Sequence, residues 1–111
     1  MKIKLPDNEI SVRVADSVSK RAFGLSFRKE GKMLFKFSRD TRAPIDMMLM
    51  RDSLYLYFMN SEKEVIHVEK AYPWYSLPEK FLHRPEDKYR YLLESFESLN
   101  LEEGDQVRFH G

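Results

Sequence analysis

The sequence predicts a mainly β protein, folded as a small barrel-like antiparallel β sandwich with two short helices. Several short segments alternate apolar and polar residues, and this period of two is typical of strands with one buried face. The most apolar segments lie in the middle of the chain and are apolar on both faces, as expected of strands covered on two sides. These observations predict a closed or two-layered β fold, with a more open α+β sheet as the alternative.

The first part of the chain contains two strand patterns and one helical pattern. Residues 10–14 alternate apolar and polar side chains, and residues 33–37 repeat the alternation. Between them, residues 17–24 place apolar side chains at helical spacing. Ser17 suits the N-terminal cap of a helix, and Gly24 suits the left-handed conformation that ends one. We therefore expect a strand, a short helix and a second strand in this order.

Two hairpins are predicted in the middle of the chain. Residues 45–50 and 54–59 are strongly apolar, and residues 51–53 between them have the composition of a turn. Residues 60–63 form a second polar turn, and residues 65–68 return as a third strand. Three strands joined by two successive turns predict an antiparallel meander.

The last part of the chain begins with a long segment that has no regular pattern. Residues 71–88 contain three of the five prolines, and a loop of this length is uncommon in a compact domain and often functional. Residues 89–93 resume the alternation of a strand, and residues 95–100 predict a short helix with Ser95 as its cap. Residues 107–109 predict the last strand.

Length and composition exclude several classes of protein. The 111 residues suit a single domain over residues 1–111, and hydrophobic residues at 42% exclude a disordered chain. No stretch approaches the ~20 apolar residues of a membrane span, and no signal peptide is recognisable, so we expect a cytoplasmic protein. The absence of cysteine excludes disulfides and thiolate metal sites. Abundant lysine and glutamate beside a single glutamine favour a thermophilic origin.

Six short elements follow one another along the chain, namely RAFGLSFR at 21–28, GKMLFKF at 31–37, FMN with VIHV at 58–60 and 65–68, YPW at 72–74, YLLE at 91–94 and LEEGDQV at 101–107. Together, and in this order, they resemble the motifs of domain-of-unknown-function family 192, also called uncharacterised protein family 0127, in its archaeal form. The resemblance covers about residues 10–109 and implies a β-rich fold with no established reaction. Leu49 and Tyr55 stand where the family commonly has asparagine and aspartate. The resemblance therefore makes catalysis a weaker expectation than binding.

Charge is distributed unevenly along the chain, although the net charge is only +1. Residues 1–42 hold eleven basic and five acidic side chains, whereas residues 43–111 hold eight basic and thirteen acidic ones. The stretch 20–42 is the most basic, and its Arg21 and Arg28 suit bidentate binding of a carboxylate or phosphate. The alternative is a solvated basic face that pairs with the acidic second half of the chain.

The irregular segment supplies aromatic candidates for the same site. Tyr72 and Trp74 lie at its start, and aromatic side chains on irregular segments can wall a ligand pocket. The alternative is a plug that covers the open end of a small barrel. We therefore predict that Arg21, Arg28, Tyr72 and Trp74 bind a ligand.

Other groups of residues are weaker candidates for metal binding or acid–base catalysis. The three histidines are scattered, and methionines more often fill irregular cores than bind copper, so we expect neither a metal nor a cofactor. Asp46 lies inside an apolar run and is a candidate general acid. His67 and Glu69 lie next to each other on one strand face, which suits a proton relay. An edge aspartate and a solvated strand face are the simpler interpretations.

Taken together, the residues predict a non-catalytic protein that binds a small polar or anionic ligand, or a protein partner. The ligand is expected between the Arg21/Arg28 region and the 72–83 loop. A nucleic-acid-binding module that uses the stretch 20–42 is one alternative, disfavoured by the near-neutral net charge. A hydrolase-like enzyme that acts on carbohydrate or a phosphorylated metabolite through Asp46, His67 or Glu69 is another. We expect a monomer or weak homodimer without a membrane partner.

Overall fold

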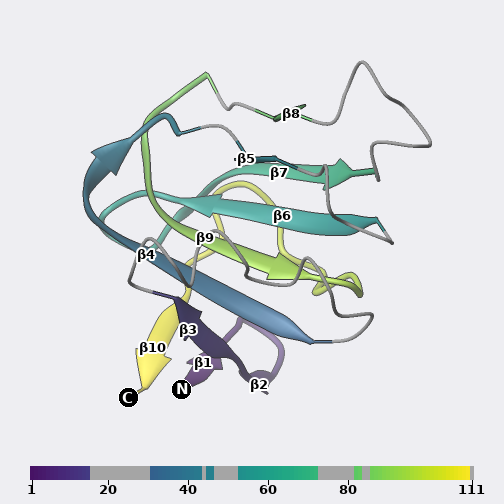
Figure 1. Ribbon diagram of the computed structural model, residues 1–111. Helices are drawn as coiled ribbons and strands as arrows, with labels where there is room; N and C mark the ends of the chain where they lie inside the picture. Colours follow the sequence, from purple (N-terminus) through teal and green to yellow (C-terminus); the bar gives the residue numbers. More distant parts are fainter. Residues whose placement is uncertain (16–30, 44, 47–52, 73–81, 84–85, 111) are drawn as a thin grey trace.

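The computed structural model of the protein is built from strands and irregular segments (Figure 1). It describes residues 1–15, 31–43, 45–46, 53–72, 82–83 and 86–110. No helix occurs in these ranges, so none there is long and apolar enough to cross a membrane. The prediction of a mainly β protein is confirmed.

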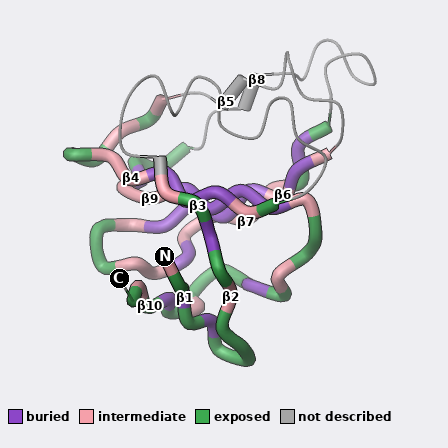
Figure 2. The backbone as a smooth tube through the Cα atoms, turned by 60° about the horizontal axis from the view of Figure 1, so that its bottom comes forward, coloured by how far each residue is buried: buried purple, intermediate pink, exposed green. Residues whose placement is uncertain are grey.

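The strands form one large sheet, one small sheet and a short pair. They are β1 (Lys2–Lys4), β2 (Glu9–Ser11), β3 (Arg13–Ala15), β4 (Lys32–Thr41), β5 (Ile45–Asp46), β6 (Leu54–Met59), β7 (Val65–Ala71), β8 (Leu82–His83), β9 (Tyr89–Ser95) and β10 (Arg108–His110). The five-stranded sheet has the order β3-β4-β9-β6-β7, and the three-stranded sheet has the order β10-β1-β2. Figure 2 shows the three-stranded sheet as a separate layer against the five-stranded one. The protein is therefore a two-layered β structure, and within the described ranges its sheets do not close into the predicted barrel.

The hairpin between β6 and β7 is confirmed, and a single side chain organises its turn. The Asn60 Oδ1 accepts hydrogen bonds from the backbone N–H groups of Glu62 and Glu64, at 2.9 and 3.0 Å. Lys63 has a φ of 65°, a left-handed conformation that the tight turn requires. The polar run at 60–63 therefore specified both the turn and the pairing of its flanking strands.

The other predicted hairpin, between 45–50 and 54–59, is wrong. β5 at 45–46 pairs with β8 at 82–83, and the neighbours of β6 in the large sheet are β7 and β9. An apolar run on both faces indicates a central strand, but its pairing partner depends on distant segments. Here β9, which follows β6 by thirty residues along the chain, takes the place beside β6 that the sequence assigns to residues 45–50.

The strand predicted over 10–14 is divided between the two sheets. β2 pairs with β1 in the small sheet, whereas β3 pairs with β4 in the large sheet. Val12 lies at the crossing point, is buried, and exchanges backbone hydrogen bonds with Met1. The β3–β4 pair is parallel, so the prediction of an entirely antiparallel structure is also wrong. A parallel pair needs a long crossover connection, and residues 16–30 between these strands lie outside the described residues.

The predicted helix at 95–100 is absent. β9 continues to Ser95, whose hydroxyl donates to the Glu97 carbonyl and accepts from the Glu97 N–H. This local turn competes with helix formation, as serine side chains commonly do. Phe96 and Leu99 then pack against the two different faces of the sheet, which one helix face would not allow. The other predicted helix, at 17–24, lies outside the described residues.

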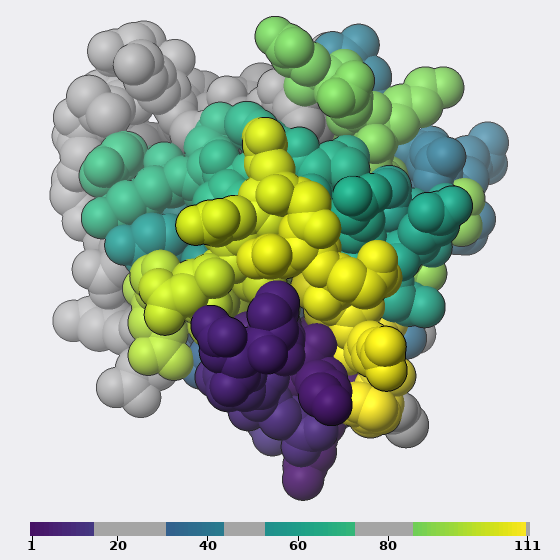
Figure 3. All heavy atoms as spheres, turned by 180° about the vertical axis from the view of Figure 1, so that it is seen from behind, coloured from purple at the N-terminus to yellow at the C-terminus, as the bar shows by residue number. Residues whose placement is uncertain are grey.

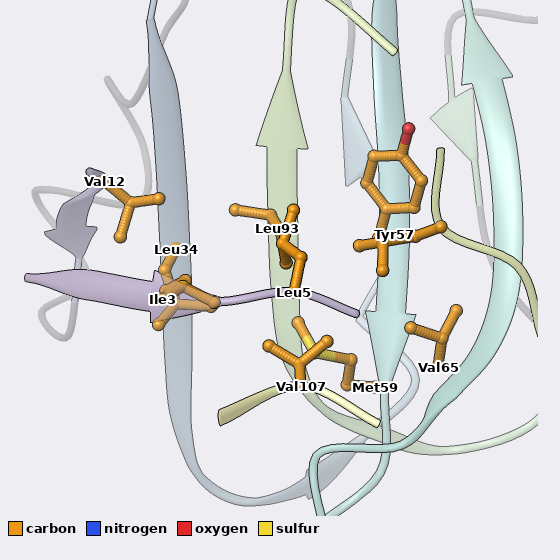
Figure 4. Close-up of a cluster of buried hydrophobic side chains, with 10 residues drawn as sticks. Ile3, Leu5, Val12, Leu34, Tyr57, Met59, Val65, Leu93 and Val107 are labelled. Carbon is orange, nitrogen blue, oxygen red and sulfur yellow. The ribbon is translucent and has the colours of Figure 1, made fainter. Parts of the chain in front are cut away.

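Each face of the five-stranded sheet carries its own apolar cluster. On the inter-sheet face, which packs against the three-stranded sheet, Leu34, Tyr57 and Leu93 meet Ile3 and Val107 (Figure 4). The opposite face is called the Glu94 face below, because Glu94 lies on it. Its cluster comprises Met33, Phe35, Leu54, Leu56, Phe58, Ala71, Tyr89 and Leu92. Alternate residues of the same strands therefore serve two separate cores.

Candidate functional site

An ionisable side chain lies in the middle of the Glu94 face. Glu94 on β9 is the cross-strand partner of Met33 on β4 and of Leu56 on β6. Leu56 is in turn the partner of Glu69 on the edge strand β7. Directly opposed residues of neighbouring strands point to the same face, so two carboxyl groups flank Leu56 in one row across the sheet. Glu94 and Glu69 lie two strands apart in the sheet, so their Cα atoms are about 10 Å apart.

The next row of this face ends in a histidine. Phe58 on β6 is the partner of His67 on β7, and their rings lie 5.6 Å apart. The His67 Nε2 is 3.5 Å from the Glu69 Oε1, and its Nδ1 is 3.9 Å from the Glu103 Oε1. The sequence-based prediction that His67 and Glu69 are neighbours is therefore confirmed. Both side chains remain about a third exposed, so they lie at the rim of the face.

Glu94 differs from these rim residues because it is buried. Its residue is 6% exposed, and burial is the one cause of its pKa shift, with no contribution from a hydrogen bond or a neighbouring charge of a described residue. Burial disfavours the charged form and raises the pKa of Glu94 from 4.5 to about 8. The carboxyl is therefore neutral at pH 7, with one O–H donor and one carbonyl acceptor.

Glu94 belongs to the family-like element YLLE at 91–94, but the sequence did not lead us to predict it as a site residue. A signal was available, because Glu94 is the one acidic residue inside an otherwise apolar stretch of the β9 strand. Alternation alone did not reveal its burial, since both faces of β9 turn out to be covered. The site residue was missed because the sequence does not state how many faces of a strand are buried.

A hollow of about 350 Å³ lies at the end of the sheet where β4 begins and β9 ends. Its described lining consists of Gly31, Lys32, Phe96 and Glu97. Phe96 follows Glu94 by two residues and packs against the same apolar cluster. The Lys32 Nζ is 2.7 Å from the Glu97 Oε1, and this hydrogen bond and charge lower the pKa of Glu97. The hollow thus combines an aromatic wall with a charged pair, and Glu94 lies two residues before Phe96 rather than among the described lining residues.

Glycine at the mouth of this hollow has a conformational reason. Gly31 precedes β4 with a φ of 126°, a value that side-chain-bearing residues rarely adopt. The part of the wall that Gly31 contributes therefore has no side chain.

Of the four predicted ligand-binding residues, the structure places one. Tyr72 follows β7 and is 40% exposed, and the Lys70 Nζ lies 5.5 Å from its ring centroid. The same ammonium lies 5.3 Å from the ring of Tyr55, which packs on the inter-sheet face. Tyr72 is thus not brought together with Glu94. The other three predicted residues, Arg21, Arg28 and Trp74, lie outside the described residues.

The described part of the basic stretch 20–42 is engaged in contacts within the protein. Lys32 pairs with Glu97, and the Lys36 Nζ lies 5.7 Å from the ring centroid of Phe109. Arg90 pairs with Asp40 at 3.0 Å, so the one acidic residue of this stretch that the structure describes is also occupied. These contacts support the interpretation of a basic surface that the acidic half of the chain neutralises in part.

Metal and acid–base candidates are less well supported by the geometry. Within the described ranges, no three histidine, aspartate or glutamate side chains gather as metal ligands. Asp46 pairs through its backbone with Leu82, and the structure describes the backbone of Asp46 but not its side chain. The chemistry that the described residues offer is therefore hydrogen bonding by a neutral carboxyl at the edge of an apolar face.

The fold and this site define a class of protein, a small two-layered β protein with a buried carboxyl on one face of its larger sheet. The chain belongs to the DUF192 family, described as Uncharacterized ACR, COG1430, whose model matches residues 1–109. It is 33% identical over 108 residues to a UPF0127 protein of Pyrococcus furiosus, covering 91% of this chain and 88% of the relative. It is 32% identical over 108 residues to a UPF0127 protein of Pyrococcus horikoshii, covering 91% and 89%. The resemblance noted in the sequence is thus confirmed, and the relatives are archaeal proteins from thermophiles.

Two solved structures share the fold. One is a candidate transcription regulator from Sinorhizobium meliloti 1021, with a TM-score of 0.80 and 20% identity, covering 96% of this chain and 89% of that one. The other is a protein of unknown function from Novosphingobium aromaticivorans DSM 12444, with a TM-score of 0.76 and 19% identity, covering 97% and 82%. At this identity the likeness concerns the fold alone.

Proposed function

We propose that the protein binds a small polar molecule in the hollow beside Phe96, with the Glu94 carboxyl as its anchor. The observation that carries this proposal is a glutamate, 6% exposed, whose pKa is shifted by burial alone, without a hydrogen bond or charge from a described residue. Leaving a buried polar group unpaired costs about 1–3 kcal/mol. A leucine at this position would avoid that cost, so the carboxyl has a use that stability does not explain.

The chemistry of Glu94 defines the class of ligand. In its neutral form the carboxyl donates one hydrogen bond and accepts others, which matches a ligand with an adjacent acceptor and donor, such as an amide or lactam. The apolar neighbours Met33 and Leu56 favour a neutral group, because a charged one loses its hydration. Phe96 offers apolar contact, and the Lys32–Glu97 pair offers polar contacts at the rim. A volume of about 350 Å³ lies in the range of small-molecule sites.

The alternatives have less support. The described cations of the stretch 20–42 are largely engaged in contacts within the protein, which weakens the case for nucleic acid. The Sinorhizobium neighbour is named as a candidate transcription regulator, and a small-molecule site would suit a regulatory role as well as a metabolic one. Catalysis through Glu94 and Glu69 is not favoured, because Leu56 lies between them in the row. Arg21, Arg28 and Trp74 stay predictions for the remainder of a ligand site.

A fragment titration followed by amide NMR tests this function. The probes are lactams, simple carboxamides, alcohols, amines and carboxylates at millimolar concentration. We expect lactams and carboxamides to shift the resonances of Gly31, Lys32 and Phe96 in the natural protein. Glu94→Leu should abolish these shifts, and Glu94→Gln should retain part of them because an amide also donates and accepts. Equal binding to the Leu variant, or no response from any probe at these residues, would contradict the proposal.

A further inference from the structure

A second surface with an unusual arrangement of charge lies on the three-stranded sheet. Lys2 and Lys4 of β1 and Arg108 and His110 of β10 are exposed, whereas Ile3 between the lysines is fully buried. Strand alternation therefore places these four side chains on the outer face of the small sheet. Figure 3 shows the N-terminal and C-terminal segments side by side on one surface of the molecule. The two ends of the chain thus build one basic surface.

The register brings these basic residues into direct opposition. Lys4 is the cross-strand partner of Arg108, and Lys2 is the partner of His110. Like charges directly opposed on one sheet face are destabilising. Lys4 is also the cross-strand partner of Glu9 on β2, so one row across the small sheet runs Arg108, Lys4, Glu9. The Lys4–Arg108 end of this row is the more basic one, and an anion that bridges these two cations would relieve their repulsion.

A hollow of about 490 Å³ opens on this surface and is lined by charges of both signs. Lys4, Arg108 and His110 line one side of it, and Asp7 and Glu9 line the other. The strand order β10-β1-β2 explains this division, because the cations come from β10 and β1 and the acids from β2 and the turn before it. The turn is fixed by a hydrogen bond of 2.7 Å from the Leu5 N–H to the Asn8 carbonyl. The hollow therefore has a cationic side and an acidic side at fixed positions.

We propose that this hollow binds a phosphorylated sugar. The phosphate lies against Lys4 and Arg108, whose ammonium and guanidinium groups donate charge-assisted hydrogen bonds. The sugar hydroxyls point toward Asp7 and Glu9, because carboxylates accept hydrogen bonds from hydroxyl groups, as an acidic residue does from ribose in dinucleotide sites. A long polyanion fits less well, since the same carboxylates repel a continuous row of phosphates. The ligand is thus a small molecule with one anionic end and one hydroxyl-bearing end.

This site is separate from the one that Glu94 anchors. The hollow lies on the outer face of the three-stranded sheet, whereas the Glu94 face is the side of the five-stranded sheet turned away from it. The inter-sheet cluster lies between them. Chemical shifts in the two places can therefore be read independently, and either proposal can fail without the other.

Amide NMR titrations with ribose phosphate, inorganic phosphate and ribose test the site. We expect ribose phosphate to shift the resonances of Lys4, Asn8 and Arg108 and to bind more tightly than either phosphate or ribose alone. The double variant Lys4→Met and Arg108→Met should bind ribose phosphate at least about tenfold more weakly, because both phosphate contacts are lost. The matched control Lys2→Met removes a lysine of the same strand and face that does not line the hollow. It should change the affinity by less than about twofold.

Four outcomes would overturn this proposal. If inorganic phosphate binds as tightly as ribose phosphate, the acidic side contributes nothing and the surface is a simple anion site. If the double variant binds like the natural protein, or if the shifts map to Gly31 and Phe96, the ligand occupies another place. If a short single-stranded RNA binds far more tightly than ribose phosphate and is displaced by salt, the surface recognises nucleic acid. Because all the substituted residues are exposed, unchanged melting temperatures will show that the variants remain folded.

Discussion

The two faces of the five-stranded sheet are built from the same strands but differ in their chemistry. On the inter-sheet face, Leu34, Leu93 and Met59 are fully buried, and the Tyr57 hydroxyl accepts a 2.9 Å hydrogen bond from the Leu99 N–H. The Tyr57 hydroxyl, a buried polar group of that face, therefore has a partner. The Glu94 face carries an unpaired buried carboxyl in its middle, with Glu69 and His67 at its rim.

Alternate residues of one strand therefore serve two different faces, one of which is apolar around Leu93 and one of which also holds the carboxyl that we propose to bind a ligand. On β9, Leu93 points to the inter-sheet face and its neighbours Leu92 and Glu94 point to the other. Burial of apolar surface stabilises both faces, but only the Glu94 face retains a group whose burial costs free energy. The comparison predicts that substitutions of adjacent residues on β9 have opposite effects.

The pH dependence of stability should show the largest effect. Folded Glu94 keeps its proton up to about pH 8, whereas the unfolded chain releases it near the ordinary value of 4.5. Between these values the folded state binds more protons, so the free energy of unfolding falls as pH rises. The stabilising contribution is complete below pH 4.5 and is lost through pH 8, in total on the order of 5 kcal/mol.

Urea unfolding of the natural protein and of Glu94→Gln over this pH range measures the effect. The glutamine does not titrate, so the difference between the two proteins isolates the ionisation of Glu94. A difference that stays constant with pH would show that Glu94 is either paired or hydrated in the folded protein.

Leu93→Ala should test the inter-sheet face. Its side chain is fully buried and packs with Ile3 and Val107, so we expect a loss of about 3 kcal/mol in the free energy of unfolding. Leu92→Ala is the matched variant, since Leu92 is as buried but faces the other way. Hydrogen exchange should quicken in β1 for Leu93→Ala and not for Leu92→Ala. Equal effects on β1 would show that the two faces are not independent.

Glu94→Leu should increase stability while removing ligand binding. A leucine of similar size replaces the unpaired carboxyl with apolar surface, and we expect a gain of about 1–2 kcal/mol at pH 7. Thermal and urea unfolding at pH 7 measure it. A loss of stability in this variant would mean that the carboxyl has a stabilising partner, which would remove the main support for the proposed function.

Tyr57→Phe should have the smallest effect of the four. It removes the hydroxyl that accepts the Leu99 N–H but keeps the buried ring, so we expect a loss of about 1 kcal/mol. Urea unfolding measures the loss, and a faster exchange of the Leu99 amide should accompany it. No change in that amide would show that water replaces the hydroxyl, and that polar groups on the inter-sheet face need no partner from the protein.

Local patterns predicted much of the fold where neighbouring residues carry the information. The alternation of 89–93 and the turn at 60–63 gave strands and a hairpin that the structure confirms. The segment 95–100 failed because Phe96 and Leu99 have helical spacing but pack against opposite faces of the sheet. Spacing states which side chains are apolar, whereas the turn at Ser95 and the two clusters decide where they point.

The sequence by itself determined the β class, the family and the positions of the main strands, because these depend on side chains a few residues apart. The tertiary structure decided that β9 lies between β4 and β6, and that both faces of the sheet are covered, so Glu94 is buried and stays neutral at pH 7. It also decided that Lys4 meets Arg108, from opposite ends of the chain. The physical reason is the same in each case. Pairing, burial and opposed charges arise from contacts between distant residues, and a local period of two contains no information about them.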